Sequence, residues 1–401
     1  MDSPDQCASR LSRKRKFEYQ EDDGTLDLDD LNQDLLEKVL SWLPTSAFFR
    51  LTSVCKRWKS VADSTSFKLA CSEIPSRQPW FFMVGSCLDK SVVFDSTESK
   101  WKQLNHPSFL RKDLGFMPVA SSGGLICFRN ASGDFIVSNP MTGSFRELPH
   151  TENQTVHAIV MQSSPGPCHS FELVLVCGEF PRLSFKTFNS ALNRWGDANP
   201  LSKNHHDSGE IEEDAVYFLS KAGNLVSTNM LRSPSKQYSS VTTMKNGNEI
   251  VYFLSSSGAV VACDLTSKCF SEYPRLLPIW SEYSIDIVEC RGEMIAVVLS
   301  EFFESASLRM WRYDEGNRSW QQVMAMPPAM AHEFYGKKVD INCLGAGDRI
   351  LICLNSSELF RYILYDSVGN EWTELPTCDV KGEVMEFMSA FSFEPRIEAS
   401  V

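Results

Sequence analysis

One short pattern recurs along most of this chain and constrains its fold more than any other feature. Each copy is an apolar strand-like run that ends near an Asp or Asn, then a polar turn, then an aromatic residue that opens the next run. Copies include FIVSNPMTGSFREL, LRMWRYDEGNRSWQQV and YILYDSVGNEWTELP. The Asp or Asn side chain supports the turn through hydrogen bonds to the backbone, and the aromatic ring supplies a large buried surface. Short strands separated by regular turn signals predict a mainly β repeat architecture.

The spacing of the aromatic residues predicts the size of the repeating unit. They fall at Trp101, Phe145, Trp195, Tyr238, Phe270, Trp320 and Trp372. A mean interval of about 45 residues suits four short strands with their turns, which is one blade of a β-propeller. Residues 80–398 hold seven such units if a degenerate copy from Val216 is included, so we expect six or seven blades. A pair of β-sandwiches with chance aromatic spacing is the alternative.

The end of the chain predicts how such a propeller closes. The run VMEFMSAFSFEP is strand-like and lies after the last turn signal. We expect it to pair with the first blade, because that pairing would remove an open sheet edge.

A helical pattern precedes the repeats, over residues 31–75. Apolar residues recur at three- and four-residue steps, which predicts an amphipathic helix; they are Leu35, Leu36, Val39, Leu40 and Leu43. Asn32 is a suitable N-cap, and Pro44 ends the helix. About 40 residues in short helices are too few for a good core, so this module needs a neighbouring domain or a partner.

Residues 1–30 differ from the rest in being polar and highly charged. The basic cluster Arg13 to Lys16 is followed by a run rich in Asp and Glu. Such a segment cannot bury enough apolar surface to order itself. The basic cluster fits a nuclear import signal or a plain solvated tail. The domains expected are therefore a charged tail over 1–30, a helical module over 31–75 and a propeller over 80–398.

Composition excludes several classes of protein. The net charge is −12 with 39 basic and 51 acidic residues, which argues against non-specific binding to nucleic acid or to anionic membranes. There is no long apolar run and no secretory signal, so we expect a protein of the nucleus, the cytoplasm or both, without a membrane anchor. The thirteen cysteines contain no CxxC pair, which is typical of free thiols in a reducing compartment.

Motifs for catalysis are missing from the sequence. It contains no HExxH, GxSxG, P-loop or GxGxxG motif. The pair His205 and His206 stands in a polar loop without a neighbouring Cys, and Cys263 and Cys269 bracket a polar turn. Neither pattern has metal-ligand spacing. We therefore expect no cofactor, no metal and no enzymatic activity.

The segment LNQDLLEKVLSWLPTSAFFRLTSVCKRWKSVADSTSF resembles an F-box. The matching features are the leucine stripe, the Leu43–Pro44 break, the Phe48–Phe49 pair and VCKRW. The repeats that follow resemble degenerate kelch repeats, with a Gly123–Gly124 doublet and a spaced tryptophan. The chain after residue 30 thus resembles a plant-type F-box/kelch-repeat protein.

This resemblance implies a function, a set of partners and a set of contact residues. Members of the family are non-catalytic substrate receptors of Skp–cullin–F-box ubiquitin ligases: the F-box docks on a Skp-type adaptor, and the propeller holds a protein substrate. Carried over by position, the adaptor-binding residues are Leu31, Leu36, Leu40, Leu43, Pro44 and Phe48, whereas Val54, Trp58 and Val61 belong to the module's own core. One departure is Asn32, where the family usually has proline, so the resemblance implies one apolar contact fewer with the adaptor.

Two further readings stay open, and the substrate is not identified. The chain could bind the adaptor as a scaffold without leading to degradation, or the propeller could be an enzyme or a ligand sensor. Substrate recognition in repeat propellers lies in the loops of one face. The segment RLLPIWSEY offers Trp280 and Tyr283, which suit either a substrate-binding hot spot or a loop packed between blades.

Overall fold

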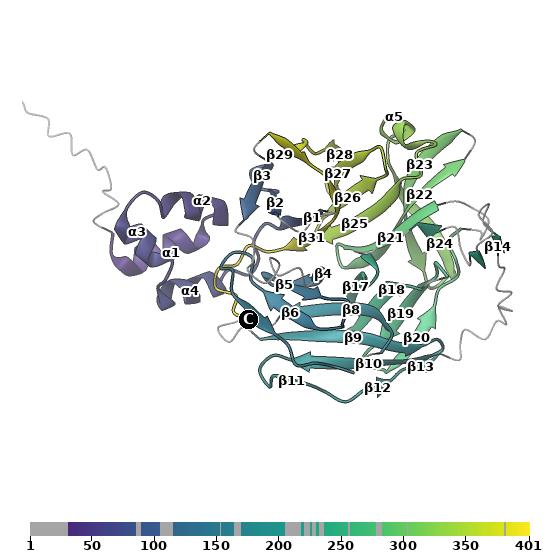
Figure 1. The fold of residues 1–401 in the computed structure, drawn as a ribbon, viewed down its shortest axis with the longest axis horizontal. Coiled ribbons are helices and arrows are strands. Elements are labelled where there is room, and N and C mark those ends of the chain that lie inside the picture. The colour runs from purple at the N-terminus through teal and green to yellow at the C-terminus, as the bar shows by residue number, and fades with distance from the viewer. Residues whose placement is uncertain are drawn as a thin grey trace, which may run out of the picture.

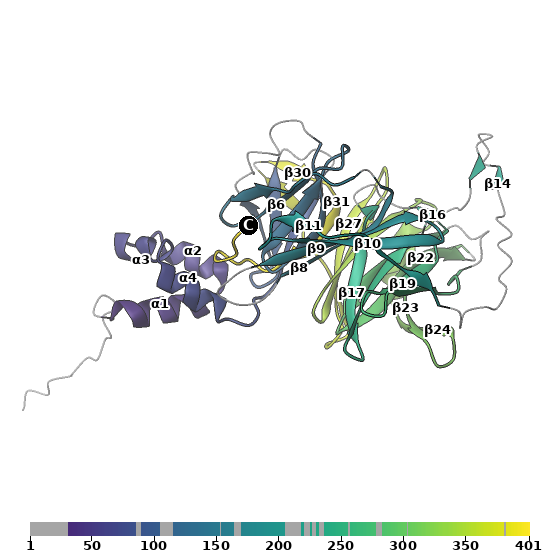
Figure 2. The same cartoon turned by 90° about the horizontal axis from the view of Figure 1, so that it is seen from below.

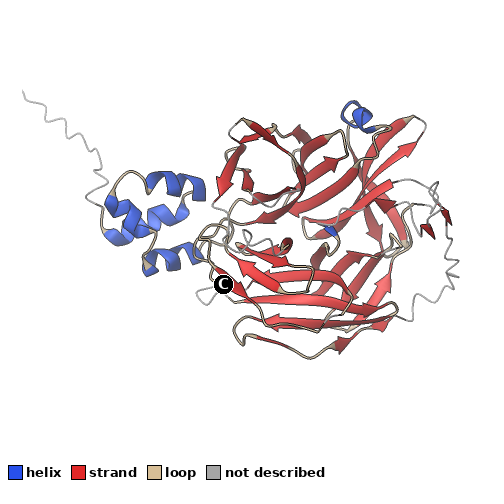
Figure 3. Cartoon of the chain, in the orientation of Figure 1, coloured by secondary structure: helices blue, strands red, loops and turns tan. Residues whose placement is uncertain are grey.

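A computed structural model gives the fold, which is mainly β with four helices at the N-terminal side (Figures 1 and 3). The residues that the structure describes are 31–85, 90–104, 115–152, 154–163, 170–204, 218–219, 225–226, 230–231, 236–255, 257–277, 283–302, 304–380 and 382–401. Within these ranges, no helix is long and apolar enough to cross a membrane.

Four short helices form the helical module, in the order expected from the apolar pattern. They are α1 (Gln33–Trp42), α2 (Thr45–Leu51), α3 (Lys56–Val61) and α4 (Thr65–Ser72). The side chain of Asn32 accepts a hydrogen bond from the Asp34 backbone and so caps α1 as predicted. Pro44 separates α1 from α2, and the Ser64 hydroxyl caps α4.

Six antiparallel sheets of four main strands form the propeller. Blade 1 consists of β31 (Phe387–Phe393), β1 (Trp80–Gly85), β2 (Ser91–Asp95) and β3 (Lys100–Leu104). Blade 2 consists of β4 (Met117–Ser122), β5 (Leu125–Arg129), β6 (Phe135–Ser138) and β7 (Phe145–Glu147). Blade 3 consists of β8 (Val156–Ser163), β9 (Phe171–Glu179), β10 (Arg182–Asn189) and β11 (Arg194–Trp195).

The other three blades repeat this arrangement, and their first strands complete the inner ring. Blade 4 consists of β17 (Ser240–Lys245), β18 (Asn248–Leu254), β19 (Val260–Asp264) and β20 (Cys269–Glu272). Blade 5 consists of β21 (Tyr283–Cys290), β22 (Glu293–Phe302), β23 (Ser305–Asp314) and β24 (Ser319–Ala325). Blade 6 consists of β25 (Asp340–Ala346), β26 (Arg349–Asn355), β27 (Phe360–Asp366) and β28 (Glu371–Glu374).

Short elements decorate the connections between these blades. They are β12 (Asn199–Pro200), β13 (Ser202–Lys203), β14 (Phe218–Leu219), β15 (Leu225–Val226), β16 (Met230–Leu231), α5 (Pro328–Ala331), η5 (His332–Phe334), β29 (Cys378–Val380) and β30 (Glu383–Met385). Of these, β12, β13 and β16 each add a short edge to a blade.

The blade count is six, the lower of the two values expected. The count of seven included the degenerate copy from Val216, most of which lies outside the described residues. Its described strands β14 and β15 pair with each other as a two-stranded sheet and not as a blade. The aromatic residue of that copy, Tyr238, packs against the core shared by blades 2 and 3. Its place in the aromatic series therefore does not mark the outer strand of a separate blade.

The ring closes as predicted from the C-terminal run. Strand β31 pairs antiparallel with β1, and Phe82 lies opposite Phe391 in this register. The innermost strand of blade 1 is therefore the last strand of the chain. Its pairing joins the first and last parts of the propeller sequence in one sheet, so β1 is not left as a free sheet edge.

The two ends of the propeller differ in what they carry. In blades 2 to 6 the turns after the first and third strands lie at one end of the propeller, as does the turn β2–β3 of blade 1, and the connections to the next blade lie at the other end. The C-terminus reaches the first end, where the turns β4–β5 and β6–β7 are, and the helical module lies beside it (Figures 1 and 2). We call this end the module face and the opposite end the connection face.

The glycine doublet has a specific role at the module face. Gly124 adopts φ +90°, and a Cβ added there would lie 2.8 Å from the Cβ of Arg396. Only glycine allows this backbone conformation and this approach without strain. The turn thus makes room for the C-terminal segment.

Candidate functional site

The core of the helical module draws on all four helices. Leu36 and Leu40 are 1% and 2% exposed, and Phe48 is 2% exposed. Phe48 stacks on Phe67 of α4 with ring centroids 4.8 Å apart. The rest of this cluster is Trp58, Val61 and Cys71, with Leu31, Leu43 and Leu51 packed at its margin.

A second apolar surface lies on the outer side of α1. Leu35, Val39 and Trp42 are 57%, 53% and 64% exposed. They are spaced at i, i+4 and i+7, so they lie on one side of the helix. We call these three residues the α1 apolar face. Phe49 and Val54 are further exposed apolar residues of the module.

The structure divides the predicted adaptor-binding residues between the inside and the margin of the module. Leu36, Leu40 and Phe48 are enclosed by the module itself, whereas Leu31 and Leu43 are half-buried and Pro44 is exposed. Contact of these residues with an adaptor stays a prediction. Leu36, Leu40 and Phe48 are buried because they lie on the sides of α1 and α2 that pack against α3 and α4 in one shared cluster.

The predicted core of the module is right in two of three positions. Trp58 and Val61 belong to the buried cluster. The prediction for Val54 is wrong, because Val54 follows the end of α2 and its side chain is exposed. Val54 lies before α3, which begins only at Lys56, so it does not share the helix that carries Trp58 and Val61 into the core.

The α1 apolar face was not assigned a role from the sequence, although a signal for it exists. Leu35 and Val39 each precede a buried leucine, so α1 carries apolar residues in two adjacent columns. Leu36 and Leu40 already supply the core-facing column of α1, whereas Leu35 and Val39 are exposed. The second column is therefore the feature that points to a partner.

Polar contacts fix α1 against α4 and orient both of its faces. The carboxylate of Glu37 is buried and accepts hydrogen bonds from Gln33 and from Ser64, both at 2.9 Å. Burial acts to raise the pKa of Glu37, but hydrogen bonds from Ser66, Gln33 and Ser64 outweigh it and hold the pKa below its ordinary value. The charged form of Glu37 is thus the one that joins α1 to the cap of α4.

A buried ion pair lies among the inner strands of the propeller. Lys236 donates to the carbonyl of Cys343 at 2.6 Å, and its Nζ lies 3.6 Å from Oδ2 of Asp286. The same carboxylate accepts from the Cys343 backbone at 2.7 Å. Because Asp286 lies in blade 5 and Cys343 in blade 6, this cluster joins two blades.

The other sequence-based candidates lie largely outside the described part of the chain. Trp280 is outside it, and of Tyr283 only its position at the start of β21 is described. Their role in substrate binding stays a prediction. His205 and His206 are also outside. Among the residues that the structure does describe, no group of three His, Cys, Asp or Glu side chains is placed to hold a metal ion.

Comparison with known proteins identifies both parts of the chain. The F-box domain family matches residues 28–70, and the KIB1-4 beta-propeller family matches residues 93–331. F-box only protein 13 of Arabidopsis thaliana is 54% identical over 97% of this chain and 90% of its own length. F-box only protein 6 of the same plant is 27% identical over 92% of this chain and 75% of its own length.

The resemblance to kelch-repeat proteins is more limited. An F-box/kelch-repeat protein of Arabidopsis thaliana is 37% identical, but over 29% of each chain. The propeller is therefore assigned by the KIB1-4 match, which spans most of its blades, and by the six sheets described above. This chain belongs to the F-box proteins that carry a KIB1-4 beta-propeller.

Proposed function

We propose that this protein is a non-catalytic substrate receptor of a Skp–cullin–F-box ubiquitin ligase. The helical module binds a Skp-type adaptor and, through it, a cullin, while the propeller binds a target protein for ubiquitination. The observation that carries the proposal is the α1 apolar face, which is exposed on a module that matches the F-box family.

The α1 apolar face suits recognition of a helix in a groove. An amphipathic helix binds a hydrophobic groove through anchors at i, i+4 and i+7, and Leu35, Val39 and Trp42 have this spacing. Tryptophan is among the residues most enriched at binding hot spots. The buried column of Leu36 and Leu40 supports this surface from behind by fixing the helix on the module core.

We assign the target protein to the connection face of the propeller. The helical module lies beside the module face (Figures 1 and 2), so the opposite end is the one that the module does not cover. That end carries the connections between blades, and binding residues gather on such loops because a rigid scaffold positions them. In the sequence, Trp280 falls between β20 of blade 4 and β21 of blade 5.

Co-expression with a Skp-type adaptor tests the proposal. The wild-type chain is expected to form a 1:1 complex in size-exclusion chromatography with mass determination. Val39→Asp should abolish the complex, because it places a charge in the centre of the α1 apolar face. Val368→Asp is the control, since Val368 is also an exposed valine but lies in the turn β27–β28 of blade 6. A folded wild-type chain that ignores the adaptor would refute the proposal.

Ubiquitin transfer separates a receptor from a scaffold. A reconstituted ligase with this chain should modify a protein captured on the connection face. If the complex assembles but a captured protein is never modified, the chain acts as an adaptor-binding scaffold.

A further inference from the structure

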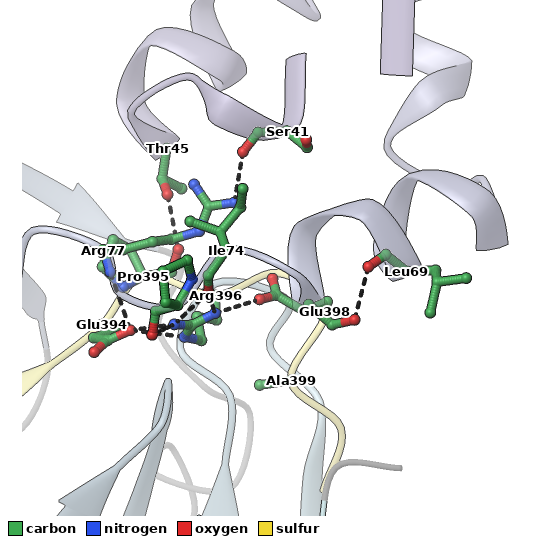
Figure 4. A network of polar contacts seen from close by, with 12 residues as sticks. Ser41, Thr45, Leu69, Ile74, Arg77, Glu394, Pro395, Arg396, Glu398 and Ala399 are labelled. Carbon is green, nitrogen blue, oxygen red and sulfur yellow. Dashed lines mark hydrogen bonds and ion pairs between the residues drawn. The ribbon is translucent and has the colours of Figure 1, made fainter. Parts of the chain in front are cut away.

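The last eight residues of the chain run between the helical module and the propeller (Figure 4). We call residues 394–401 the C-terminal strap. Ile397 packs against the core of the helical module, and Ala399 belongs to the core cluster of blades 2 and 3. Two residues apart in the sequence, these side chains enter two different hydrophobic cores.

Arg396 is the central polar residue of the strap. Its guanidinium donates to the carbonyls of Ile74 and Pro75 at 3.1 Å and pairs with Glu394 at 2.6 Å and Glu398 at 3.0 Å. Its own carbonyl accepts a hydrogen bond from Asn139 at 2.9 Å, in the turn β6–β7. Arg396 thus contacts the linker after α4, the strap itself and blade 2.

The linker residue Arg77 extends this network to α1. Its backbone N–H donates to Glu394 at 3.2 Å, and its guanidinium donates to the carbonyls of Ser41 and Leu43 at 2.9 and 3.1 Å. These carbonyls lie at the C-terminal end of α1, where the helix dipole favours a cation. Thr45, at the start of α2, donates to the carbonyl of Pro395 at 2.8 Å. The strap therefore holds the module at the ends of two helices.

The other connections between module and propeller are weaker. Arg50 of α2 pairs with Glu98 of the turn β2–β3, but the Arg50 side chain is 68% exposed. Water and salt screen such a pair, so it contributes little to fixing the orientation of the module. Residues 73–79 form an extended linker without a hydrophobic core of their own. The linker also carries the buried side chain of Ile74 and the guanidinium of Arg77, but both residues bond to the strap: the Ile74 carbonyl accepts from Arg396, and the Arg77 N–H donates to Glu394.

We propose that the C-terminal strap fixes the orientation of the helical module relative to the propeller, with Arg396 as its positioning residue. The consequence for ubiquitin transfer rests on the proposed function: a fixed module holds the bound target at a set place relative to the ligase and raises the effective concentration of its lysines. The mechanical part of the proposal concerns the free chain and needs no adaptor.

Cys71 provides a local reporter of the strap. It lies beside a small cavity lined also by Arg77, Pro395 and Ile397. Burial raises the pKa of the Cys71 thiol to about 12, so it should react slowly with an alkylating reagent at neutral pH while the strap is seated. Cys127, buried in blade 2, has a pKa that burial also raises, and it reports opening of the propeller itself.

The experiment measures alkylation of Cys71 and Cys127 by peptide mass spectrometry on the full chain. Arg396→Ala is compared with Arg312→Ala, a control that removes an exposed arginine paired with Glu293 on blade 5. We expect Arg396→Ala to speed the labelling of Cys71 at least tenfold with no change at Cys127. Arg312→Ala should change neither rate.

Small-angle scattering of the same variants measures orientation directly. Arg396→Ala should increase the maximum dimension of the free chain, and Arg396→Lys should give an intermediate value, because lysine keeps the charge but not the planar set of donors. Unchanged Cys71 labelling and unchanged dimensions in Arg396→Ala would overturn the proposal. Faster labelling of both cysteines would overturn it too, since Arg396 would then support the propeller as a whole. A wild-type chain that does not bind the adaptor would refute the proposed function, but it would not change the labelling and scattering results for the free chain.

Discussion

The indole Nε1 of Trp195 donates a hydrogen bond to the carbonyl oxygen of Pro149 at 2.8 Å. Trp195 lies on the outer strand of blade 3, and Pro149 follows the outer strand of blade 2. Two other junctions repeat this contact: Trp101 donates to Pro376 at 2.9 Å, and Trp320 donates to Pro274 at 2.7 Å. The tryptophans of the repeat thus join neighbouring blades as well as filling their own.

Replacing Trp195 by phenylalanine tests this contact. Phenylalanine keeps an aromatic ring in the core but loses the donor to the Pro149 carbonyl. We expect the free energy of unfolding to fall by about 1 kcal/mol, measured by urea denaturation. Trp42→Phe is the control, because Trp42 is exposed on the helical module, and its stability should match the wild type. Equal losses in both variants would mean that the interblade bond contributes nothing specific.

The same tryptophans show why the propeller could be predicted from the sequence, whereas the blade count could be predicted only as six or seven. A repeated turn and aromatic identify the unit, since each blade must solve the same packing problem with its neighbour. Tyr238 satisfied the spacing for another reason: its hydroxyl accepts a hydrogen bond from Arg129 at 2.7 Å, and its ring lies under that guanidinium. An aromatic at the expected interval can therefore serve a contact between blades 2 and 3 without belonging to a blade of its own.

The helical module shows how far the binding residues could be predicted from the sequence. The periodicity predicted α1, its cap at Asn32 and its end before Pro44. The periodicity could not decide whether Leu35 or Leu36 faces the core, because adjacent residues on a helix lie only about 100° apart around its axis. Which of them faces the core depends on where α4 packs, and that is a tertiary contact. The strap was beyond sequence reasoning for the same reason: Ile397 meets the module more than 300 residues away in the chain.

Truncating Leu40 should unfold the module and spare the propeller. Leu40→Ala leaves a cavity in a small core, and such changes cost about 2–5 kcal/mol. We expect limited proteolysis to remove the α1–α4 region rapidly while the six blades stay intact. Leu35→Ala, which shortens an exposed side chain on the same helix, should be digested like the wild type. Resistance of Leu40→Ala would show that the core does not depend on α1.

Removing the buried cation at Lys236 should destabilise the propeller. Lys236→Met leaves the Asp286 carboxylate without its cation at 3.6 Å, and breaking a buried pair in this way costs about 3–5 kcal/mol. Urea denaturation measures the loss. The double variant Lys236→Met with Asp286→Asn should recover part of it, because no unpaired charge remains. If the double variant were no more stable than Lys236→Met, charge burial would not be the cause.

Glu249 should make the stability of the protein depend on pH in a defined direction. Burial and the nearby carboxylate of Glu172 raise the pKa of Glu249 above its ordinary value of 4.5. Its Oε1 is buried and has no hydrogen-bond partner in the described part of the chain. As pH rises past 4.5, the unfolded chain releases this proton before the folded chain does, so stability falls until the raised pKa is passed.

Glu249→Gln removes this titration. The variant should equal the wild type in stability near pH 4 and exceed it at pH 7, as thermal melts at the two values would show. Glu293→Gln is a control on an exposed carboxylate that pairs with Arg312, and it should give no such gain at pH 7. A stability difference for Glu249→Gln that does not change with pH would exclude ionisation of Glu249 as its source.

Two C-terminal truncations separate the closure of the propeller from the strap. Ending the chain after Gly382 removes β31, and with it the buried residues Phe387 and Phe393 and the pairing to β1. We expect this chain to lose its cooperative thermal transition, because blade 1 lacks its inner strand. Ending the chain after Phe393 removes only the strap; the propeller should then melt within roughly 5 °C of the wild type, a loss of one or two kcal/mol at this size. Cys71 should become reactive in that second chain while Cys127 stays protected. If both truncated chains melted alike, the pairing of β31 with β1 would not be what stabilises the closed ring.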